Sequence, residues 1–544
     1  MRGKGPLALL IAAIVVVAAL YVAQRPADSV TPRGDGRYRP LLARGDGHML
    51  YLMTRSLVFD RNLHFDNDLE RFGDPWNQRR TATGRKGIPH PIGPALVWAP
   101  LLAAAQGAAL LANRAGASIQ EHGYTLFHQR IVFTSSVLFA AGAVLLGRAA
   151  AGRIGTGSWA ASGAAAAVLL GTSLTYYASF MPSYAHAMDA FFASAFLLVW
   201  LRGAGDLHPR RFALLGLLCG AAALVRNQEL GLAVVVALEL LVALRRAPAR
   251  AVACGALFAV ATAVAFAPQL FAWHEVYGSW LALPQGPRYV RPGHPMLLEV
   301  LFAENGWFST TPLAALAVLG LVVLAARRRD LPSVGLLAAV AVLVYLSSTI
   351  YDWWGSAAFG QRRLCGVTLP LVVGLAALVD TRRLLALAVA ALVAALVALN
   401  LVRVLDPAAG RAPPAIHVFE PGLDALADGS YRDQRAVLDL ARDEKLATRG
   451  LGQADFVDGR FFRPVAGRAE ISLRLNLPDR LRLTLPVRGS GEVVVSWNGE
   501  VVARGVAGTA WSDLVFEVDP CVGKNVLAIE GTELRVSSLE LGYD

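Results

Sequence analysis

The sequence LLALAVAALVAALVALNLV, residues 384–402, contains no charged side chain. A helix needs about 20 apolar residues to cross the hydrocarbon core of a bilayer, so this stretch predicts a transmembrane helix. The composition of the whole chain agrees, because 55% of its 544 residues are hydrophobic and 17% are charged. Soluble domains carry roughly 25% charged residues. The predicted fold class is therefore an α-helical polytopic membrane protein.

Similar apolar runs recur along the chain and predict about 11 transmembrane helices. The predicted spans are Pro6–Ala23, Ile131–Gly147, Trp159–Tyr177, Ala185–Leu201, Phe212–Val225, Leu230–Leu244, Ala251–Ala267, Pro312–Ala326, Val334–Ile350, Leu364–Val379 and Leu384–Val402. When Arg2 and Lys4 are placed in the cytoplasm, the arginine-rich connections after the second, fourth, sixth, eighth and tenth spans also fall inside. This arrangement satisfies the positive-inside rule and predicts a cytoplasmic (inner) membrane protein with a cytoplasmic N-terminus.

One apolar run, Ile92–Ala112, is long enough to span but would reverse the arginine-rich connections that follow it. We therefore expect it to lie along the outer interface or to dip into it. A true twelfth span remains the alternative. With this run at the interface, the long connections lie outside: the first loop (residues 24–130), the second loop (268–311), the late motif (351–363) and everything after residue 403.

The sequence after residue 403 changes character. Residues 404–467 read as a linker with a short helix at Tyr431–Lys445, and residues 468–544 alternate as short strands. Asn498-Gly499 between two apolar runs predicts a type I′ hairpin. We expect an extracytoplasmic all-β sandwich here, following a membrane domain of residues 1–403.

Charge and cysteine content exclude other classes. The formal charge of +11 comes mainly from arginine at helix ends, which indicates membrane orientation and predicts no nucleic-acid partner. The four cysteines show no paired spacing, so neither a disulfide framework nor a zinc site is expected.

Ionisable residues beside membrane spans are functional candidates by default. Here they form four clusters on the predicted outer face. The candidates are Asp46, Lys86 and His90 in the first loop, His186 and Asp189 at the outer end of the fourth span, Arg226 in the turn VRNQE, and Asp352, Trp354, Gln361, Arg362 and Arg363 in the late motif. Arginine offers forked donors to phosphate oxygens. Aromatic rings cover the apolar faces of sugars, and an isolated carboxylate can act as a general base.

Plain structural roles compete with each assignment. Asp46 is well placed to be a helix N-cap, and Trp353 and Trp354 have the character of interfacial belt residues. His186 fits a packing role, and Arg226 fits an anchor for a hairpin.

The same stretches resemble a known family. The collinear motifs, which cover residues 40–380, are GDGHMLYLMTRSLVFDRNLHFDND, KGIPHPIGPALVWAPL, TYYASFMPSYAHAMDAFF, GAAALVRNQ, APQLFAWHEVYGSWLALPQG, LLEVLFAENGWFSTTPLAALAVLG and YDWWGSAAFGQRR. They resemble bacterial membrane glycosyltransferases of the GT-C superfamily, whose members include protein O-mannosyltransferases and the lipid A aminoarabinose transferase. The strands SWNGEVV and GKNVLAIEG resemble galactose-binding-like jelly rolls.

The resemblance implies an inverting glycosyltransferase that moves a sugar from a polyprenyl-phosphate carrier to a hydroxyl of a glycan, lipid or protein acceptor outside the membrane. It assigns the catalytic carboxylate to Asp46, which a helix at Met49–Val58 would hold at the membrane surface. It places Lys86 and His90 at the donor phosphate, with Gln361, Arg362 and Arg363 also at the donor site. Many relatives carry Asp-Glu where this chain has Asp46-Gly47, so no cofactor is assigned; a divalent metal fits the family, but no His or Cys cluster indicates one.

Three other functions stay open. A transporter or flippase for a lipid-linked sugar is one, although such proteins tend to carry internal repeats and charges near the midplane, and neither pattern is evident. A glycan polymerase or ligase is the second, although the first-loop Asp with the Pro-rich motif is not expected of it. A non-catalytic member whose β-domain binds glycan is the third.

Overall fold

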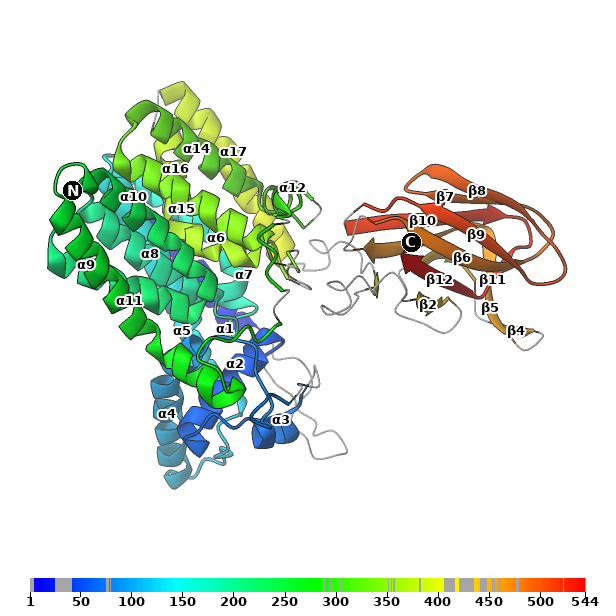
Figure 1. The fold of residues 1–544 in the computed structure, drawn as a ribbon, viewed down its shortest axis with the longest axis horizontal. Helices are drawn as coiled ribbons and strands as arrows, with labels where there is room; N and C mark the ends of the chain where they lie inside the picture. Colours follow the sequence, from blue (N-terminus) through cyan, green and yellow to red (C-terminus); the bar gives the residue numbers. More distant parts are fainter. Residues whose placement is uncertain are drawn as a thin grey trace. The chain divides into compact units, whose positions relative to one another are not determined.

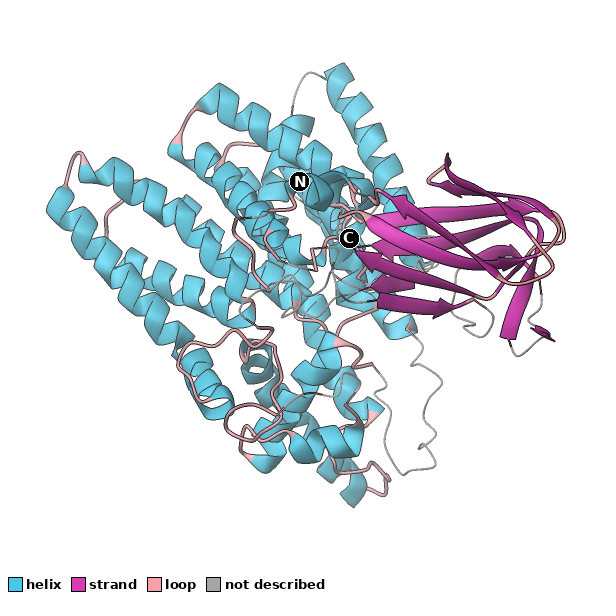
Figure 2. Cartoon of the chain, turned by 45° about the vertical axis from the view of Figure 1, so that its right-hand side comes forward, coloured by secondary structure: helices cyan, strands magenta, loops and turns pink. Residues whose placement is uncertain are grey.

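The computed structural model describes residues 4–24, 42–74, 78, 80–286, 289–293, 295–303, 305–350, 352–353, 355, 358–380, 383–405, 416–419, 435–440, 448–452, 455–457, 460–475, 479–521 and 523–543. The chain divides into two units, one of Met1–Leu301 with Gly306–Leu405 and the other of Phe302–Asn305 with Asp406–Asp544. The first is helical and the second is built from strands (Figures 1 and 2).

The helical unit follows the predicted apolar runs closely. Its elements are α1 (Lys4–Ala23), α2 (Asp46–Arg55), η1 (Ser56–Asp60), α3 (Asp66–Phe72), α4 (Gly93–Arg114), α5 (Leu126–Arg153), α6 (Ser158–Gly171), α7 (Ser173–Ser179), α8 (His186–Arg202), α9 (Pro209–Val225), η2 (Asn227–Leu232), α10 (Ala233–Leu244), α11 (Pro248–Tyr277), α12 (Leu297–Phe302), α13 (Trp307–Thr310), α14 (Pro312–Arg328), α15 (Leu331–Ser348), η3 (Arg362–Val367), α16 (Thr368–Val379) and α17 (Arg383–Leu405). Every predicted span coincides with helical residues. The third span is broken at Thr172, between α6 and α7.

Among the described residues, 8 helices are long and apolar enough to cross a membrane, or 9 if the bent pair Leu297–Thr310 and Pro312–Arg328 forms one span. The protein is thus a multi-pass membrane protein, as predicted. The count of about 11 is not confirmed, because α8 and α9 have 17 residues each and α6 has 14.

Helix α4 contains the run for which the sequence left two readings. It is continuous over 22 residues and passes the same test for a span as the other helices. Figure 1 shows α2, α3 and α4 together at the end of the helical unit away from the N-terminus. The expectation that this run lies along the interface stays a prediction beside the twelfth-span alternative.

Residues 49–58 are helical, as predicted, and belong to α2 and η1, but the prediction that this helix is amphipathic and lies at the membrane interface is wrong. Helix α2 ends at Arg55, and all of its residues from Gly47 onward are buried. Its polar side chains find partners inside the protein; for example, the hydroxyl of Thr54 donates to the carbonyl of Leu50 (2.9 Å). Because a helix with no exposed polar face belongs in a protein interior, α2 is a core element.

Small residues bring two long helices into close contact. A Cβ added to Gly216 of α9 would lie 2.4 Å from the carbonyl oxygen of Phe258 in α11, and one added to Gly220 would lie 2.5 Å from that of Thr262. A small residue at every fourth position lets helix backbones approach in a membrane, where van der Waals packing drives association.

The strand unit contains β1 (Ile416–Phe419), β2 (Arg435–Asp439), β3 (Thr448–Leu451), β4 (Asp455–Val457), β5 (Arg460–Leu475), β6 (Leu481–Arg488), β7 (Gly491–Trp497), β8 (Glu500–Ala507), β9 (Ser512–Val518), β10 (Gly523–Gly531), β11 (Arg535–Val536) and β12 (Ser538–Tyr543). The strands pair in the order β2-β12-β6-β11-β5-β10-β7-β8. The long strand β5 pairs with β11 near its start and with β10 over its second half. Alternate residues of these strands, such as Leu483 and Ile529, enclose one apolar core.

Two details of the strand prediction have different outcomes. The hairpin at Asn498-Gly499 is confirmed, because both residues have positive φ (51° and 93°), as a type I′ turn requires. The helix predicted at Tyr431–Lys445 is wrong where the structure describes it, since Arg435–Asp439 is strand β2 and pairs with β12. Strands also begin within the predicted linker, at Ile416.

The α9–α11 contact gives a first prediction. Gly216→Ala should lower the free energy of unfolding by roughly 1–3 kcal/mol, because the added methyl group overpacks the contact with Phe258. In the matched control Gly163→Ala on α6, nothing lies within 4 Å of the new Cβ. That control should be neutral or should stabilise by about 0.4–1 kcal/mol. Thermal unfolding of the purified protein in detergent measures both changes, and equal effects of the two substitutions would contradict the packing.

Candidate active site

Glycines on both sides of Asp46 allow its backbone to lie close to the turn before α8. A Cβ on Gly45 would lie 2.2 Å from the hydroxyl oxygen of Tyr184, and one on Gly47 would lie 2.2 Å from Oγ of Ser183. Gly45 also has a positive φ of 51°, which other residues rarely adopt. The sequence Gly-Asp-Gly therefore places Asp46 directly beside residues 183–184.

Asp46 is the first residue of α2, whose N-cap is Gly45, and no side chain caps this helix end. The alternative of a capping role is therefore wrong. Instead, a carboxylate oxygen of Asp46 lies 2.8 Å from Nη1 of Arg362, with the two side chains 29% and 10% exposed. The sequence-predicted carboxylate and one of the predicted arginines thus meet, although they lie far apart in the sequence.

The charges around Asp46 decide its ionisation. Burial alone would raise the pKa of Asp46, but the positive charge of Arg362, followed by smaller effects of Arg363 and Arg226, brings that pKa below its ordinary value. Asp46 is therefore a carboxylate at neutral pH.

His90 reaches this cluster and Lys86 is engaged elsewhere. Burial, together with the charges of Arg362 and Arg226, lowers the pKa of His90 despite the opposing charge of Asp46, so the imidazole is neutral. Nζ of Lys86 lies 2.7 Å from a carboxylate oxygen of Asp74.

Arg363 joins three segments of the chain. Its Nη2 donates to the carboxylate of Asp352 (2.6 Å) and to the hydroxyl of Tyr289 in the second loop (3.2 Å), and Tyr289 donates to the same carboxylate oxygen (2.6 Å). Val290 and Ile350 form a β-bridge directly beside this contact. Arg363 is 6% exposed, so its main contacts are within the protein.

Two other residues of the late motif, Gln361 and Trp353, are buried. Gln361 is buried and precedes Arg362 directly. Trp353 is 2% exposed, so it is not an interfacial belt residue. Trp354, also a predicted substrate-binding residue, lies outside the described residues.

His186 and Arg226 meet beside two tyrosines. Nη1 of Arg226 lies 2.9 Å from Nδ1 of His186. The ring of His186 packs against those of Tyr177 and Tyr184, with centroid distances of 4.5 and 5.7 Å. The guanidinium of Arg362 lies 5.1 Å from the ring centroid of Tyr184.

Sequence reasoning did not assign these tyrosines, nor Glu229, as site residues. All three stand in the quoted motifs TYYASFMPSYAH and VRNQE, so their position in the motifs is the signal that could have found them. Burial raises the pKa of Tyr184 to about 12, with Asp46 adding to the rise, so its hydroxyl keeps its proton.

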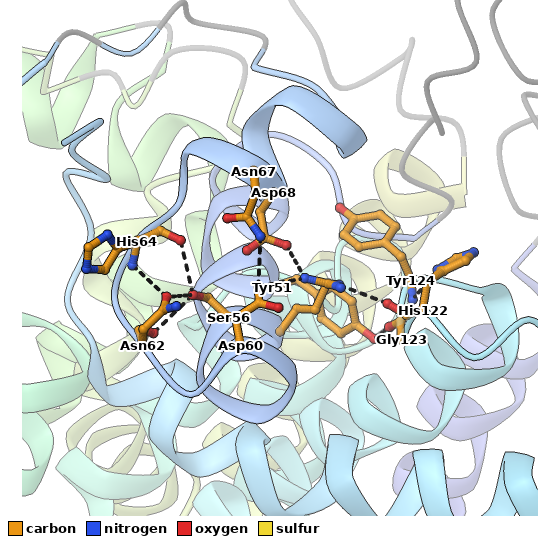
Figure 3. A network of polar contacts seen from close by, with 11 residues as sticks. Tyr51, Ser56, Asp60, Asn62, His64, Asn67, Asp68, His122, Gly123 and Tyr124 are labelled. Atoms are coloured by element: carbon orange, nitrogen blue, oxygen red, sulfur yellow. Dashed lines mark hydrogen bonds and ion pairs between the residues drawn. The ribbon is translucent and has the colours of Figure 1, made fainter.

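A second polar network, drawn in Figure 3, fixes the far end of α2. Arg55 contacts the carboxylates of Asp68 (2.5 Å) and Asp60 (3.0 Å), and its Nε donates to the carbonyl of His122 (2.9 Å). Tyr51 donates to the carbonyl of Gly123 (2.7 Å). Three separate parts of the first loop are thereby attached to the helix that begins at Asp46.

The described residues contain no group of three or more His, Cys, Asp or Glu side chains that could hold a metal ion. The cluster around Asp46 comprises this carboxylate, the guanidinium of Arg362 paired with it, the imidazoles of His90 and His186, and two tyrosine rings.

Comparisons with known proteins give only distant similarity. The chain matches no protein-family model and no curated protein sequence. It is similar to the solved structure of the oligosaccharyltransferase AglB from Archaeoglobus fulgidus (14% identity, TM-score 0.42), covering 75% of this chain and 56% of that one. It is also similar to the arabinosyltransferase EmbB from Mycobacterium smegmatis (12% identity, TM-score 0.43), covering 98% of this chain and 64% of that one.

Both of these proteins are GT-C membrane glycosyltransferases, the class that the sequence motifs resemble. This chain spans less than two thirds of the length of either. A further similarity, to the C-terminal CBM6 of LamC from Zobellia galactanivorans, covers 20% of this chain and 99% of that one, at 10% identity and a TM-score of 0.17. At such values the comparisons assign no activity to this chain.

The Arg55 network gives a second prediction. Arg55→Gln should lower the free energy of unfolding by roughly 3–5 kcal/mol, because it leaves the fully buried carboxylate of Asp68 without its cation. Faster hydrogen exchange in residues 60–73 and 119–125 should accompany the loss.

Arg85→Gln is the matched control, since the pair of Arg85 with Glu275 is half-exposed and should be worth about 0–1 kcal/mol. Hydrogen exchange and thermal unfolding in detergent compare the two variants. An Arg55 variant as stable as the Arg85 variant would show that the network does not hold the loop.

Proposed function

We propose that this protein is an inverting glycosyltransferase that moves a sugar from a polyprenyl-phosphate carrier to an acceptor hydroxyl. The observation that supports the proposal is the 2.8 Å contact between Asp46 and Arg362. A general base and a phosphate-binding cation are the two groups that such a transfer needs close together. Their proximity does not depend on any likeness to another protein.

The reaction is a single displacement at the anomeric carbon. Asp46 accepts the proton of the acceptor hydroxyl as its oxygen attacks C1, and the bond between C1 and the phosphate oxygen breaks with its electron pair going to that oxygen. Polyprenyl phosphate leaves as an anion, and the anomeric configuration inverts because attack and departure occur on opposite faces. Arg362 stabilises the leaving phosphate through charge-assisted hydrogen bonds.

The location of the cluster suits a lipid-borne substrate. Helices α2, α8 and η3 begin, and α9 ends, next to residues of the cluster. These helix ends lie at one end of a bundle of apolar helices, where a lipid-linked phosphate would sit at the membrane surface. By the positive-inside rule this is the outer face of the inner membrane.

The Asp46–Arg362 pair itself suggests how the base is controlled. Because Arg362 holds the pKa of Asp46 low, Asp46 is a weak base before substrate binds. A donor phosphate that also binds the guanidinium of Arg362 weakens the electrostatic attraction between Arg362 and Asp46. The proton affinity of Asp46 then rises in the complex, when the acceptor proton has to be removed.

The direct test is the Asp46→Asn variant. It should insert and fold normally but transfer sugar roughly 10²–10⁴-fold more slowly, because the amide cannot accept the proton. The assay follows release of polyprenyl phosphate from a polyprenyl-phosphate sugar by purified protein, and Asp206→Asn, an exposed carboxylate distant in sequence, is the control. Near-normal release by Asp46→Asn would refute the proposal, and movement of intact donor across vesicles without release would indicate a transporter.

The pH dependence of the reaction follows from the same pair. Since the pKa of Asp46 lies below its ordinary value, kcat/KM of the native protein should not fall as the pH is lowered to about 5. In Arg362→Gln, burial acts on Asp46 with less opposition and raises its pKa, so the acid limb of the profile should move to higher pH.

The control for this profile is Arg85→Gln, which removes a cation that is paired with Glu275 and not with Asp46. Its acid limb should match that of the native protein. If the acid limb of the kcat/KM profile is unchanged in Arg362→Gln, the ionisation of Asp46 does not control the rate.

A further inference from the structure

The contact between Arg226 and His186 determines which nitrogen of the histidine carries the hydrogen. A guanidinium group can donate hydrogen bonds but cannot accept them. Nδ1 of His186, 2.9 Å from Nη1 of Arg226, must therefore be the acceptor. His186 is consequently the neutral tautomer with its hydrogen on Nε2.

This Nε2–H group is buried and has no hydrogen-bond partner among the described residues. His186 as a whole is 3% exposed. A buried polar group without a partner is unusual in a native protein and calls for an explanation, such as a ligand that supplies the acceptor. The neighbouring rings of Tyr177 and Tyr184 confine the imidazole to one orientation.

The surroundings indicate what kind of acceptor fits. Three cations, Arg226, Arg362 and Arg363, lie close enough to act electrostatically on His186. An anionic oxygen suits such an environment better than a neutral hydroxyl. Donation from Arg226 to Nδ1 also polarises the ring and makes its Nε2–H group a stronger donor.

Other atoms of the Arg226 guanidinium have contacts of their own. Its Nη2 donates to the side chain of Gln228 (3.2 Å), and its Nε lies 3.6 Å from the carboxylate of Asp189, which is fully buried. Glu229, also fully buried, lies beside Asp189. Gln228 in turn donates to the carbonyl of Arg363 (2.5 Å), which ties Arg226 to the late motif.

We propose that Nε2–H of His186 donates a hydrogen bond to an oxygen of the donor phosphate, and that Arg226 is a positioning residue that fixes the tautomer required. The inference rests on the proposed function for the identity of the ligand. His186 transfers no proton and keeps its hydrogen throughout. Its hydrogen bond strengthens as negative charge grows on the phosphate during bond breaking.

Binding of polyprenyl phosphate, without sugar and without acceptor, tests the contact independently of catalysis. The amide nitrogen of glutamine can take the place of Nε2, whereas that of asparagine falls nearer to Nδ1. His186→Asn should weaken binding by about 10- to 100-fold, the usual effect of losing a hydrogen bond to a charged group, and His186→Gln should restore most of it. His208→Gln, an exposed histidine distant in sequence, is the control and should bind as the native protein does.

Two results would overturn the proposal. One is native affinity for polyprenyl phosphate in folded His186→Asn protein. The other is a loss confined to the sugar-bearing donor, which would place the contact on a sugar hydroxyl. Failure of the proposed function is a separate result, because it would appear as native transfer by Asp46→Asn while these binding measurements stay valid.

The role of Arg226 has its own readout. Nitrogen NMR of histidine-labelled protein should show His186 protonated at Nε2 in the native chain and in Arg226→Lys, and a mixture of tautomers in Arg226→Met. If Arg226→Met retains the native tautomer, Arg226 does not set it. If that variant fails to fold, Arg226→Lys and the two His186 variants still decide the proposal.

Discussion

The ion pair between Asp46 and Arg362 is the contact on which the rest of the site depends. Neither partner reaches the other by local structure, since one begins a helix of the first loop and the other begins η3. Asp46 reaches its position because Gly45 and Gly47 let the backbone lie against Ser183 and Tyr184. The far end of the same helix is then fixed by Arg55. The position of the Asp46 carboxylate thus depends on the fold of the first loop.

Three arginines near Asp46 have different tasks, although the sequence presents them as equivalent. Arg362 pairs with the carboxylate. Arg363 holds the second loop through Asp352 and Tyr289, and Arg226 orients His186. A cluster of like charges would repel itself, but each guanidinium here has an acidic neighbour of its own, namely Asp46, Asp352 or Asp189. This pairing lets three cations lie close to one another at low exposure.

The sequence predicted the parts of the structure that depend on composition and on motifs. The spans follow from apolar runs that only a membrane or a core can bury, and Asp46 and Arg362 follow from motif positions. The nature of α2 could not be predicted, because its polar residues Thr54 and Arg55 look solvent-facing in the sequence. Their partners, such as Asp68 and the carbonyl of His122, belong to other segments. For the same reason the sequence did not reveal that Lys86 pairs with Asp74, because this partner cannot be inferred from spacing alone.

The low pKa of Asp46 looks at first like a disadvantage for a base, and the ion pair explains why it is not one on the proposed reaction. A strongly basic carboxylate at a membrane surface would take a proton from water before the acceptor arrives. Arg362 prevents this in the absence of donor, because it stabilises the ionised form. In the proposed mechanism the donor phosphate competes for the same guanidinium, so binding of the donor and activation of the base become one event. Part of the binding free energy of the phosphate is thereby used to make Asp46 more basic. Binding free energy used in this way lowers the barrier of the chemical step, whereas tighter binding of the substrate alone would not.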